Sequence, residues 1–159
     1  MKILFFIESL QAGGKERKLI ELIKGLKKYP NFEIQLAVLI NEIHYQEILN
    51  LKINIHYIER KKKAKNFSIF FRFMSLVRKI KPDLIHVWGN VSAFYAIPAK
   101  LLFRKPLINN QITDAPANFK AGYTHKMNFH FSDSIISNSK AGIKSYNAPK
   151  KKYCNSEWF

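Results

Sequence analysis

The 159-residue sequence is poor in cysteine and in acidic residues, with one Cys and 11 Asp and Glu. The single Cys154 excludes an intramolecular disulfide and a zinc site built from several cysteines. A chain without disulfides fits a reducing compartment, so we expect the cytoplasm. No run approaches the roughly 20 apolar residues of a membrane-spanning helix, because Arg72 interrupts the best candidate, 67–77.

Basic residues dominate what is present. The 27 Lys and Arg give a formal net charge of +16, while 47% of the residues are hydrophobic. That hydrophobic share excludes a disordered chain, and the length suits one domain. A strongly positive protein attracts nucleic acid, phosphorylated substrates or an acidic membrane surface. Composition leaves these three partners open.

The first half of the chain alternates between strand and helix patterns. A continuous apolar run over 1–7 predicts a strand buried on both faces, and a glycine turn then leads to a helix through 19–26. Alternating apolar residues predict strands over 33–40 and 53–58. Helical spacing resumes after Asn66 and stops at Lys81-Pro82, because proline disfavours helix in the residue before it.

The second half continues the alternation. It predicts a strand over 83–87, a helix over 91–102 kinked by Pro98, and a strand over 106–109. A loop over 110–123, one or two helical turns over 125–131 and a strand over 134–136 follow, with a last helix through Tyr146. This order predicts a doubly wound, mostly parallel α/β sheet of Rossmann-like type. Ligands of such sheets bind at the carboxyl ends of the strands, here the loops 8–15, 86–90 and 137–139.

The pair Gly13-Gly14 lies between the first strand and the first helix. Backbone without Cβ atoms lets a ligand approach, and the helix N-terminus favours an anion. The pair forms neither the G-x-G-x-x-G dinucleotide fingerprint nor a P-loop, which would end in Lys-Ser/Thr. The alternative is a tight turn that binds nothing.

Three stretches together resemble the family-4 glycosyltransferases. The opening strand followed by Gly13-Gly14-Lys15-Glu16-Arg17 is similar to that family's strand and G-G-x-E-R element. The run from Lys81 to Gly89 resembles its K-P-D-hydrophobic-hydrophobic-H-x-H-G element, with Trp88 in place of the second histidine. The run from Asp133 to Ser139 resembles its D-hydrophobic-x-x-x-x-S element. The three occur in the family's order.

The resemblance implies a GT-B architecture, in which two Rossmann-like domains face each other across a cleft. This chain would be the N-terminal, acceptor-side domain over 1–152, and 153–159 departs from the family pattern. The family transfers a sugar from a nucleotide-sugar, such as a UDP- or GDP-sugar, to an acceptor with retention, and needs no other cofactor or metal. We expect this chain to lack the family's C-terminal domain, which carries an E-x7-E element. We therefore expect the chain alone to be inactive or weakly active.

The resemblance also suggests roles for individual residues. Gly13, Gly14 and Lys15 would contact the donor diphosphate. His86, expected at the end of its strand, would be catalytic by orienting an acceptor hydroxyl; a partly buried structural histidine is the equal alternative. Trp88 would bind the acceptor or belong to the core. Asn90 and Ser139 are acceptor-binding candidates that fit helix caps better.

The densest basic run is found between a predicted strand and a Phe-rich helix. It would bind an anionic membrane surface at about 1 kcal/mol per basic residue, although short charge runs are more often solvated loops. We expect a peripheral protein at the inner face of the cytoplasmic membrane. The run comprises Arg60, Lys61, Lys62, Lys63 and Lys65.

Three functions remain open from the sequence. The first is the acceptor-side domain of a retaining glycosyltransferase that makes surface polysaccharide or glycolipid on a saccharide or lipid-linked acceptor. The second is a basic nucleic-acid-binding module, for which no RNP-like, zinc-finger or helix-turn-helix pattern occurs. The third is a non-catalytic subunit that completes a separate transferase half. Its partner would be a C-terminal GT-B domain on another chain.

Overall fold

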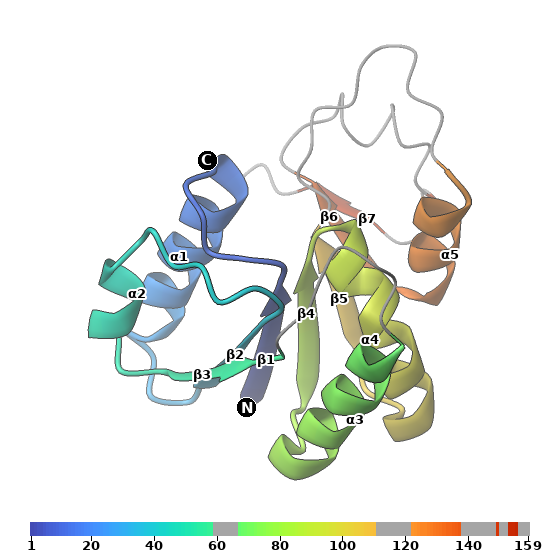
Figure 1. Cartoon of the computed structure of the whole chain (residues 1–159), viewed down its shortest axis with the longest axis horizontal. Helices are drawn as coiled ribbons and strands as arrows, with labels where there is room; N and C mark the ends of the chain where they lie inside the picture. Colours follow the sequence, from blue (N-terminus) through green and yellow to red (C-terminus); the bar gives the residue numbers. More distant parts are fainter. Residues whose placement is uncertain (59–66, 111–121, 138–148, 150–152, 156–159) are drawn as a thin grey trace.

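A computed structural model describes residues 1–58, 67–110, 122–137, 149 and 153–155 (Figure 1). Strands and helices alternate from the start, as the apolar patterns predict. The described strands are β1 (Lys2–Ile7), β2 (Glu33–Val38), β3 (Asn54–Tyr57), β4 (Leu84–Trp88), β5 (Leu107–Asn110), β6 (Ser134–Ser137) and β7 (Tyr153–Asn155). The described helices are α1 (Gly14–Leu26), α2 (Glu47–Asn50), α3 (Ser68–Ile80), α4 (Asn90–Phe103) and α5 (Tyr123–Phe131).

The strands form one sheet in the order β3-β2-β1-β4-β5-β6-β7, and every described pair is parallel. The chain builds outward from β1 in one direction and then, from β4, in the other. The strand order therefore reverses between β1 and β4, which are hydrogen-bonded neighbours. In open α/β sheets this reversal opens a crevice at the carboxyl ends of the two strands. The predicted doubly wound fold is confirmed.

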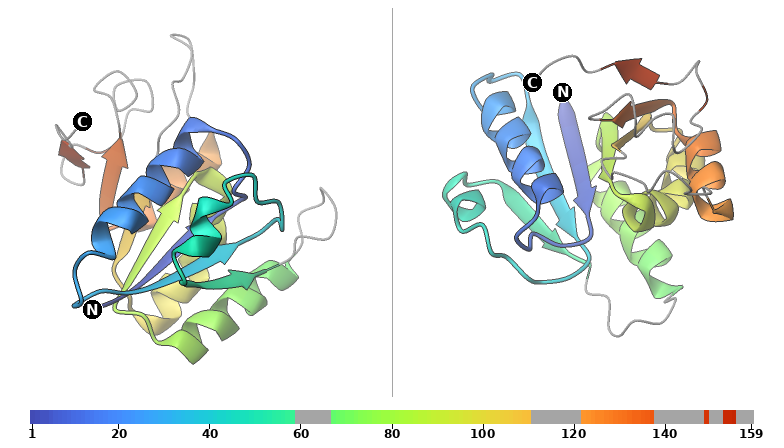
Figure 2. Two further views of the ribbon diagram at one scale, coloured as in Figure 1. Left: turned by 90° about the vertical axis from the view of Figure 1, so that its left-hand side faces the viewer. Right: turned by 90° about the horizontal axis from the view of Figure 1, so that it is seen from above.

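Helices cover both faces of the sheet (Figure 2). Helices α1 and α2 lie on one face, and α3, α4 and α5 lie on the other. Side chains of β1 alternate between the two: Phe5 packs in the core beneath α1, and Phe6 packs in the core beneath α3 and α4. Burial on both faces explains why β1 is a continuous apolar run rather than an alternating one.

The helices bury the apolar stripes that their sequences carry. In α3 the stripe comprises Ile69, Phe73, Val77 and Ile80, and the ring of Phe73 stacks on that of Phe6 with centroids 4.3 Å apart. Lys81 then takes a left-handed conformation, with φ 51°, and ends the helix before Pro82. Aromatic side chains of α3 and α4 also meet, since the Phe70 ring lies 4.8 Å from that of Tyr95.

The structure adds two elements that the sequence patterns did not predict. One is the short helix α2, and the other is β7, which extends the sheet beside β6 within the stretch that departs from the family pattern. The domain boundary at 152 stays a prediction. The predicted last helix through Tyr146 lies outside the described residues. In the described part of the chain, no helix is long and apolar enough to cross a membrane.

Candidate functional site

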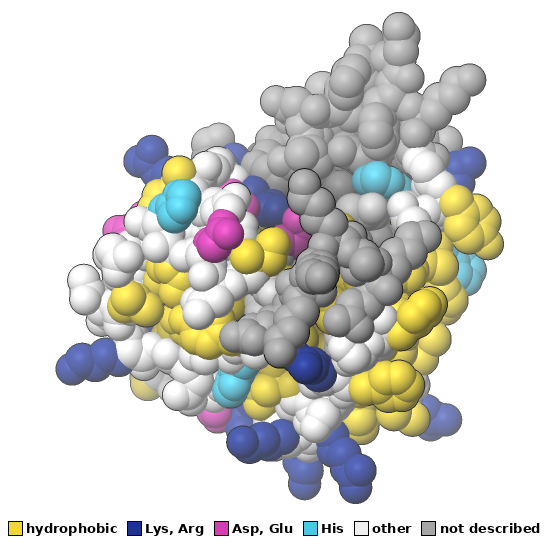
Figure 3. All heavy atoms as spheres, in the orientation of Figure 1, with side chains coloured by type: hydrophobic (Ala, Val, Ile, Leu, Met, Phe, Trp, Pro, Cys, Tyr) yellow, Lys and Arg dark blue, Asp and Glu magenta, His cyan; other side chains and the backbone are white. Residues whose placement is uncertain are grey.

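The loops after β1 and β4 meet at the reversal of strand order. A Cβ atom built on Gly89, which follows β4, would lie 3.3 Å from Lys15 Nζ and 3.6 Å from Glu8 Oε1. Glu8 directly follows β1, and Lys15 lies in the first turn of α1. Two segments that are distant in sequence thus bring together the ammonium group of Lys15, the carboxylate of Glu8 and the glycine backbone at position 89. In Figure 3, acidic and basic side chains lie close together near the carboxyl end of β1.

The start of α1 is shaped by Gly13. This residue is the extended N-cap, and no side chain caps the helix. A Cβ atom at Gly13 would overlap Oε2 of Glu16, so the glycine makes room for that carboxylate. Glu16 is 9% exposed, and its Oε1 lies 3.5 Å from Lys15 Nζ. In this structure the carboxylate therefore lies at the positive end of α1, where an anion is favoured.

Residues after β2 hold the glycine loop in place. The Tyr45 hydroxyl donates a hydrogen bond to the Gly13 carbonyl at 3.2 Å, and His44 Nδ1 accepts one from Ala12 N at 3.2 Å. Backbone bonds join Leu10 to Glu42 and His44 in the same region. Hydrogen bonds from residues 42–45 thus fix the position of the glycine loop. No sequence motif marked it, because its contacts depend on the order of the strands.

His86 lies in the middle of β4, two residues before the strand ends at Trp88. Its predicted place at the strand end is therefore wrong. The ring is 6% exposed and lies between those of Phe5 and Trp88, with centroids 5.2 and 5.4 Å away. Burial lowers the pKa of His86 from 6.5 to about 3, because a charged imidazole is unfavourable among apolar rings. His86 is therefore neutral near pH 7, and its catalytic role stays a prediction.

Trp88 is 2% exposed and packs in the core beneath α1. A place in the core was one of the two possibilities that the sequence left open for this residue. Asn90 does not cap α4, because the N-cap is Gly89 and Asn90 is the first helical residue. Asn90 instead connects α4 to α5 through its backbone and its side chain: Asn128 Nδ2 donates to the Asn90 backbone carbonyl at 2.8 Å, and Asn90 Nδ2 donates to Thr124 Oγ1 at 3.3 Å. Acceptor binding by Trp88 and Asn90 is not tested by these contacts and stays a prediction.

Buried polar atoms collect at the carboxyl ends of β4 and β5. Trp88 pairs in register with Asn110, and Val87 pairs with Asn109. Within the described residues, Trp88 Nε1, Asn110 Oδ1 and both amide atoms of Asn109 are buried without a hydrogen-bond partner. Such atoms are rare in folded proteins and indicate water or a ligand. The only sign of this group in the sequence is the pair Asn109-Asn110 at the end of β5.

The structure brings together only part of the predicted site. Gly13, Gly14 and Lys15 lie at the start of α1, as expected. Glu8 and Gly89, which belong to the predicted ligand loops 8–15 and 86–90, lie near Lys15 together with Glu16, although no individual role was predicted for these three residues. Ser139 and the basic run Arg60, Lys61, Lys62, Lys63 and Lys65 lie outside the described residues. Among the described residues, no group of three or more His, Cys, Asp or Glu could hold a metal ion.

Several solved structures share this fold. HepE from Anabaena, solved with UDP-glucose, has a TM-score of 0.78 and 16% identity over 97% of this chain and 43% of its own. The lipopolysaccharide outer core galactosyltransferase WaaB has a TM-score of 0.68 and 16% identity over 98% and 45%. A UDP-N-acetylglucosamine 2-epimerase reaches 0.70 with 16% identity over 94% and 45%. The chain thus spans less than half the length of these structures.

At such low identity these structures establish the fold, which is that of the N-terminal domain of a GT-B enzyme. The fold alone does not separate sugar transfer from epimerisation, because both kinds of enzyme share it. A comparison with curated proteins finds no match. A family model described as glycosyl transferase 4-like matches residues 3–139. The chain therefore belongs to the glycosyl transferase 4-like family.

Proposed function

We propose that this chain is the acceptor-side half of a retaining glycosyltransferase that uses a UDP- or GDP-sugar. The observation that carries the proposal is the meeting of Lys15, the uncapped start of α1 and Gly89 at the strand reversal. A diphosphate there would face a lysine ammonium and the free N–H groups of the helix. The absence of a Cβ at Gly13 and Gly89 lets the backbone approach it.

Lys15 would act by charge. In the structure its ammonium lies between the Glu16 carboxylate and Gly89. A donor diphosphate carries more negative charge than one carboxylate, so it would compete with Glu16 for the lysine and for the helix N-terminus. The geometry therefore supports exchange of one anion for another at this place.

The acceptor would lie at the ends of β4 and β5. The unpartnered polar atoms of Trp88 and Asn110, which are in register on the α1 face of the sheet, would bind sugar hydroxyls, because buried donors and acceptors gain most from a partner. His86, neutral at physiological pH, would provide a hydrogen-bonding ring nitrogen beneath them. Its low pKa favours a positioning role over proton donation.

Complete transfer would require a second GT-B domain. The groups described here reach one side of a reacting sugar, and catalysis of transfer depends on groups that surround it. We further propose a saccharide or lipid-linked acceptor in surface polysaccharide or glycolipid synthesis, at the inner face of the cytoplasmic membrane. The charge of +16 supports this location, because anionic lipid attracts basic residues.

Calorimetric titration of the full chain with UDP-glucose and with GDP-mannose tests the donor site. We expect weak binding of one nucleotide-sugar that is weakened about tenfold by Lys15→Gln, since a hydrogen bond to a charged group contributes about 1.5–3 kcal/mol. The matched control is Lys18→Gln, which removes an exposed lysine from the same helix and should leave the affinity unchanged.

Two outcomes would contradict the proposal. One is equal affinity of the Lys15→Gln and Lys18→Gln variants, which would place the ligand elsewhere. The other is robust sugar transfer by the chain with no added domain, which would exclude the half-enzyme interpretation.

A further inference from the structure

Helices α3 and α4 carry large apolar side chains that are exposed to solvent. Both helices lie on the face of the sheet opposite α1 and α2 (Figure 2). Phe71 in α3 is 69% exposed, and Leu101 and Leu102 in α4 are 53% and 66% exposed. Exposed apolar side chains that are scattered singly are normal, whereas a contiguous group of them marks an interaction surface.

The sequence of α4 is apolar around its whole circumference. Its one charged residue is Lys100, whose ammonium lies 2.7 Å from the carboxylate of Asp133, the residue before β6. The inner side of the helix, including Ala96, is buried in the core of the sheet. A surface helix ordinarily carries charged residues on its outward side. The outward side of α4 instead carries Phe94 and, two turns later, Leu101.

Aromatic contacts join α3 and α4 into one surface. The Phe70 ring of α3 lies 5.2 Å from that of Phe94 and 4.8 Å from that of Tyr95. Leu101 and Leu102 follow these two α4 residues by seven positions, so they continue the same side of the helix for about 10 Å. The outer apolar face, as we call this surface, comprises Phe67, Phe71, Phe94, Leu101 and Leu102.

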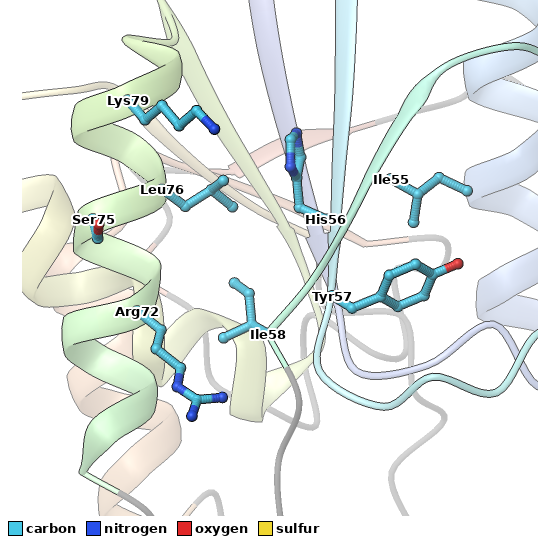
Figure 4. A pocket seen from close by; sticks show the side chains of 8 residues that line it. All are labelled: Ile55, His56, Tyr57, Ile58, Arg72, Ser75, Leu76 and Lys79. Carbon is cyan, nitrogen blue, oxygen red and sulfur yellow. The ribbon is translucent and has the colours of Figure 1, made fainter.

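The outer apolar face is separate from a groove on the other side of α3. Leu76 and Lys79 lie on that other side, where α3 faces β3 across a groove of about 530 Å³ (Figure 4). No residue of the outer apolar face lines the groove. The exposed aromatic and leucine side chains therefore belong to the side of α3 that continues onto α4.

Basic residues border the outer apolar face at one end. Neither α3 nor α4 contains a carboxylate. Each helix connects one strand to the next parallel strand, so both helices end near the amino ends of the strands. The exposed residues Arg78, Lys81 and Arg104 lie in the last turns of the two helices or directly after them. In Figure 3, hydrophobic side chains lie over α4 and α5, and Lys and Arg side chains lie along the lower edge.

We propose that the outer apolar face docks on an anionic lipid bilayer, with Arg78, Lys81 and Arg104 bound to lipid phosphates. Apolar side chains of such a face enter the boundary between headgroups and acyl chains. Long basic side chains beside them extend to the phosphates. This docking face rests on the membrane location proposed above and adds the residues that would make the contact.

The arrangement of the side chains favours a lipid surface over a folded partner protein. Phe71, Leu101 and Leu102 project from two adjacent helices, and a bilayer needs no cavity shaped to receive them. A protein partner would need carboxylates placed opposite each of the three cations. Anionic headgroups satisfy the same cations by lateral movement, because the lipids are free to diffuse.

Docking on this face would bring the candidate site close to the bilayer. Helix α4 begins directly after Gly89, which lies beside Lys15. Phe94 is five residues further along, or about 8 Å at the helical rise. The outer apolar face therefore starts next to the crevice, and a lipid-linked acceptor would have a short path to it.

Flotation of the full chain with phosphatidylglycerol/phosphatidylcholine vesicles tests the docking face. We expect binding that is at least tenfold stronger than to phosphatidylcholine vesicles and that Leu102→Gln weakens at least fivefold. Leu49→Gln is the matched control, because Leu49 is 48% exposed in α2 on the opposite face of the sheet. It should leave vesicle binding within twofold of the unmodified chain.

A second pair of variants tests the cations. Arg78→Glu should weaken binding to the anionic vesicles at least tenfold, because each basic residue near such a surface contributes about fivefold. Lys28→Glu makes the same change in charge at an exposed position after α1 and should have less than a twofold effect. Circular dichroism confirms that each variant is folded.

Fluorescence separates insertion from attraction by charge alone. The emission of Leu102→Trp, measured as the difference from the unmodified chain, should shift to shorter wavelength when anionic vesicles are added. The emission of Leu49→Trp should not shift, because position 49 would stay in water.

Several results would overturn the docking face. They are no binding to anionic vesicles, equal effects of Leu102→Gln and Leu49→Gln, equal effects of Arg78→Glu and Lys28→Glu, or an unshifted emission of Leu102→Trp. Self-association that Leu102→Gln abolishes, without vesicle binding, would assign the face to a second copy of the chain. Oligonucleotide binding that depends on Arg78, without vesicle binding, would assign the cations to nucleic acid.

The donor site is tested independently of the docking face. Leu102→Gln should bind UDP-glucose or GDP-mannose as the unmodified chain does. Lost vesicle binding with donor binding that still depends on Lys15 would overturn the docking face alone. Vesicle binding without any donor binding would overturn the donor site alone.

Discussion

Acidification from pH 7 to pH 5 is expected to destabilise the unmodified chain by about 2 kcal/mol more than the His86→Leu variant. Burial lowers the pKa of His86 from 6.5 to about 3, so the unfolded chain binds a proton on this residue before the folded chain does. The contribution of His86 is therefore fully present above pH 6.5 and is lost as the pH falls toward 3. Each pH unit within this window corresponds to about 1.4 kcal/mol.

The leucine variant keeps an apolar side chain between Phe5 and Trp88. The histidine Nε2 has no hydrogen-bond partner in the described part of the chain, so its removal leaves no other polar group unpaired. Near pH 7 we expect the free energies of unfolding of the two proteins to differ by less than about 1.5 kcal/mol.

Urea denaturation at pH 7, 6 and 5 measures this effect. The control is His130→Leu, which makes the same substitution at an exposed position in α5 and measures the general effect of replacing a histidine by leucine. If the His86→Leu variant and the unmodified chain lost stability in parallel over this range, the histidine would not be buried as described.

Replacement of Gly89 by alanine is expected to lower the free energy of unfolding by about 2 kcal/mol, within the range of about 1–3 for a strained backbone. Gly89 has φ 107° and ψ 164°, a conformation that residues with a Cβ rarely adopt. The added methyl group would also lie 3.3 Å from Lys15 Nζ, so the lysine would have to move. We therefore expect weaker binding of the nucleotide-sugar as well.

Gly25→Ala is the matched control in the last turn of α1. No atom lies within 4 Å of a Cβ built on Gly25. Alanine is the better helix former, so this variant should gain about 0.5–1 kcal/mol. Chemical denaturation of the two variants should thus show changes of opposite sign. A Gly89→Ala variant as stable as the unmodified chain would show that the positive φ is not required.

The fold could be predicted because its signals are local. A continuous apolar run such as 1–7 reports burial on both faces of a parallel strand, and helical spacing such as that of Phe73 and Val77 reports the face that covers the sheet. The pair Gly13-Gly14 likewise marked the start of α1. Helix α2 was missed because it has four residues, too few for a periodic pattern.

Other features depend on contacts between distant segments. The sequence by itself determined the alternation of strands and helices and the anion-favouring turn at Gly13 and Gly14, because these follow from neighbouring residues. Only the tertiary structure placed β1 beside β4 and so brought Gly89 to Lys15. It also placed His86 within a strand among aromatic rings, which lowers its pKa, and set the exposed apolar side chains of α3 and α4 side by side. Strand order decides each of these, and strand order results from packing of the whole chain.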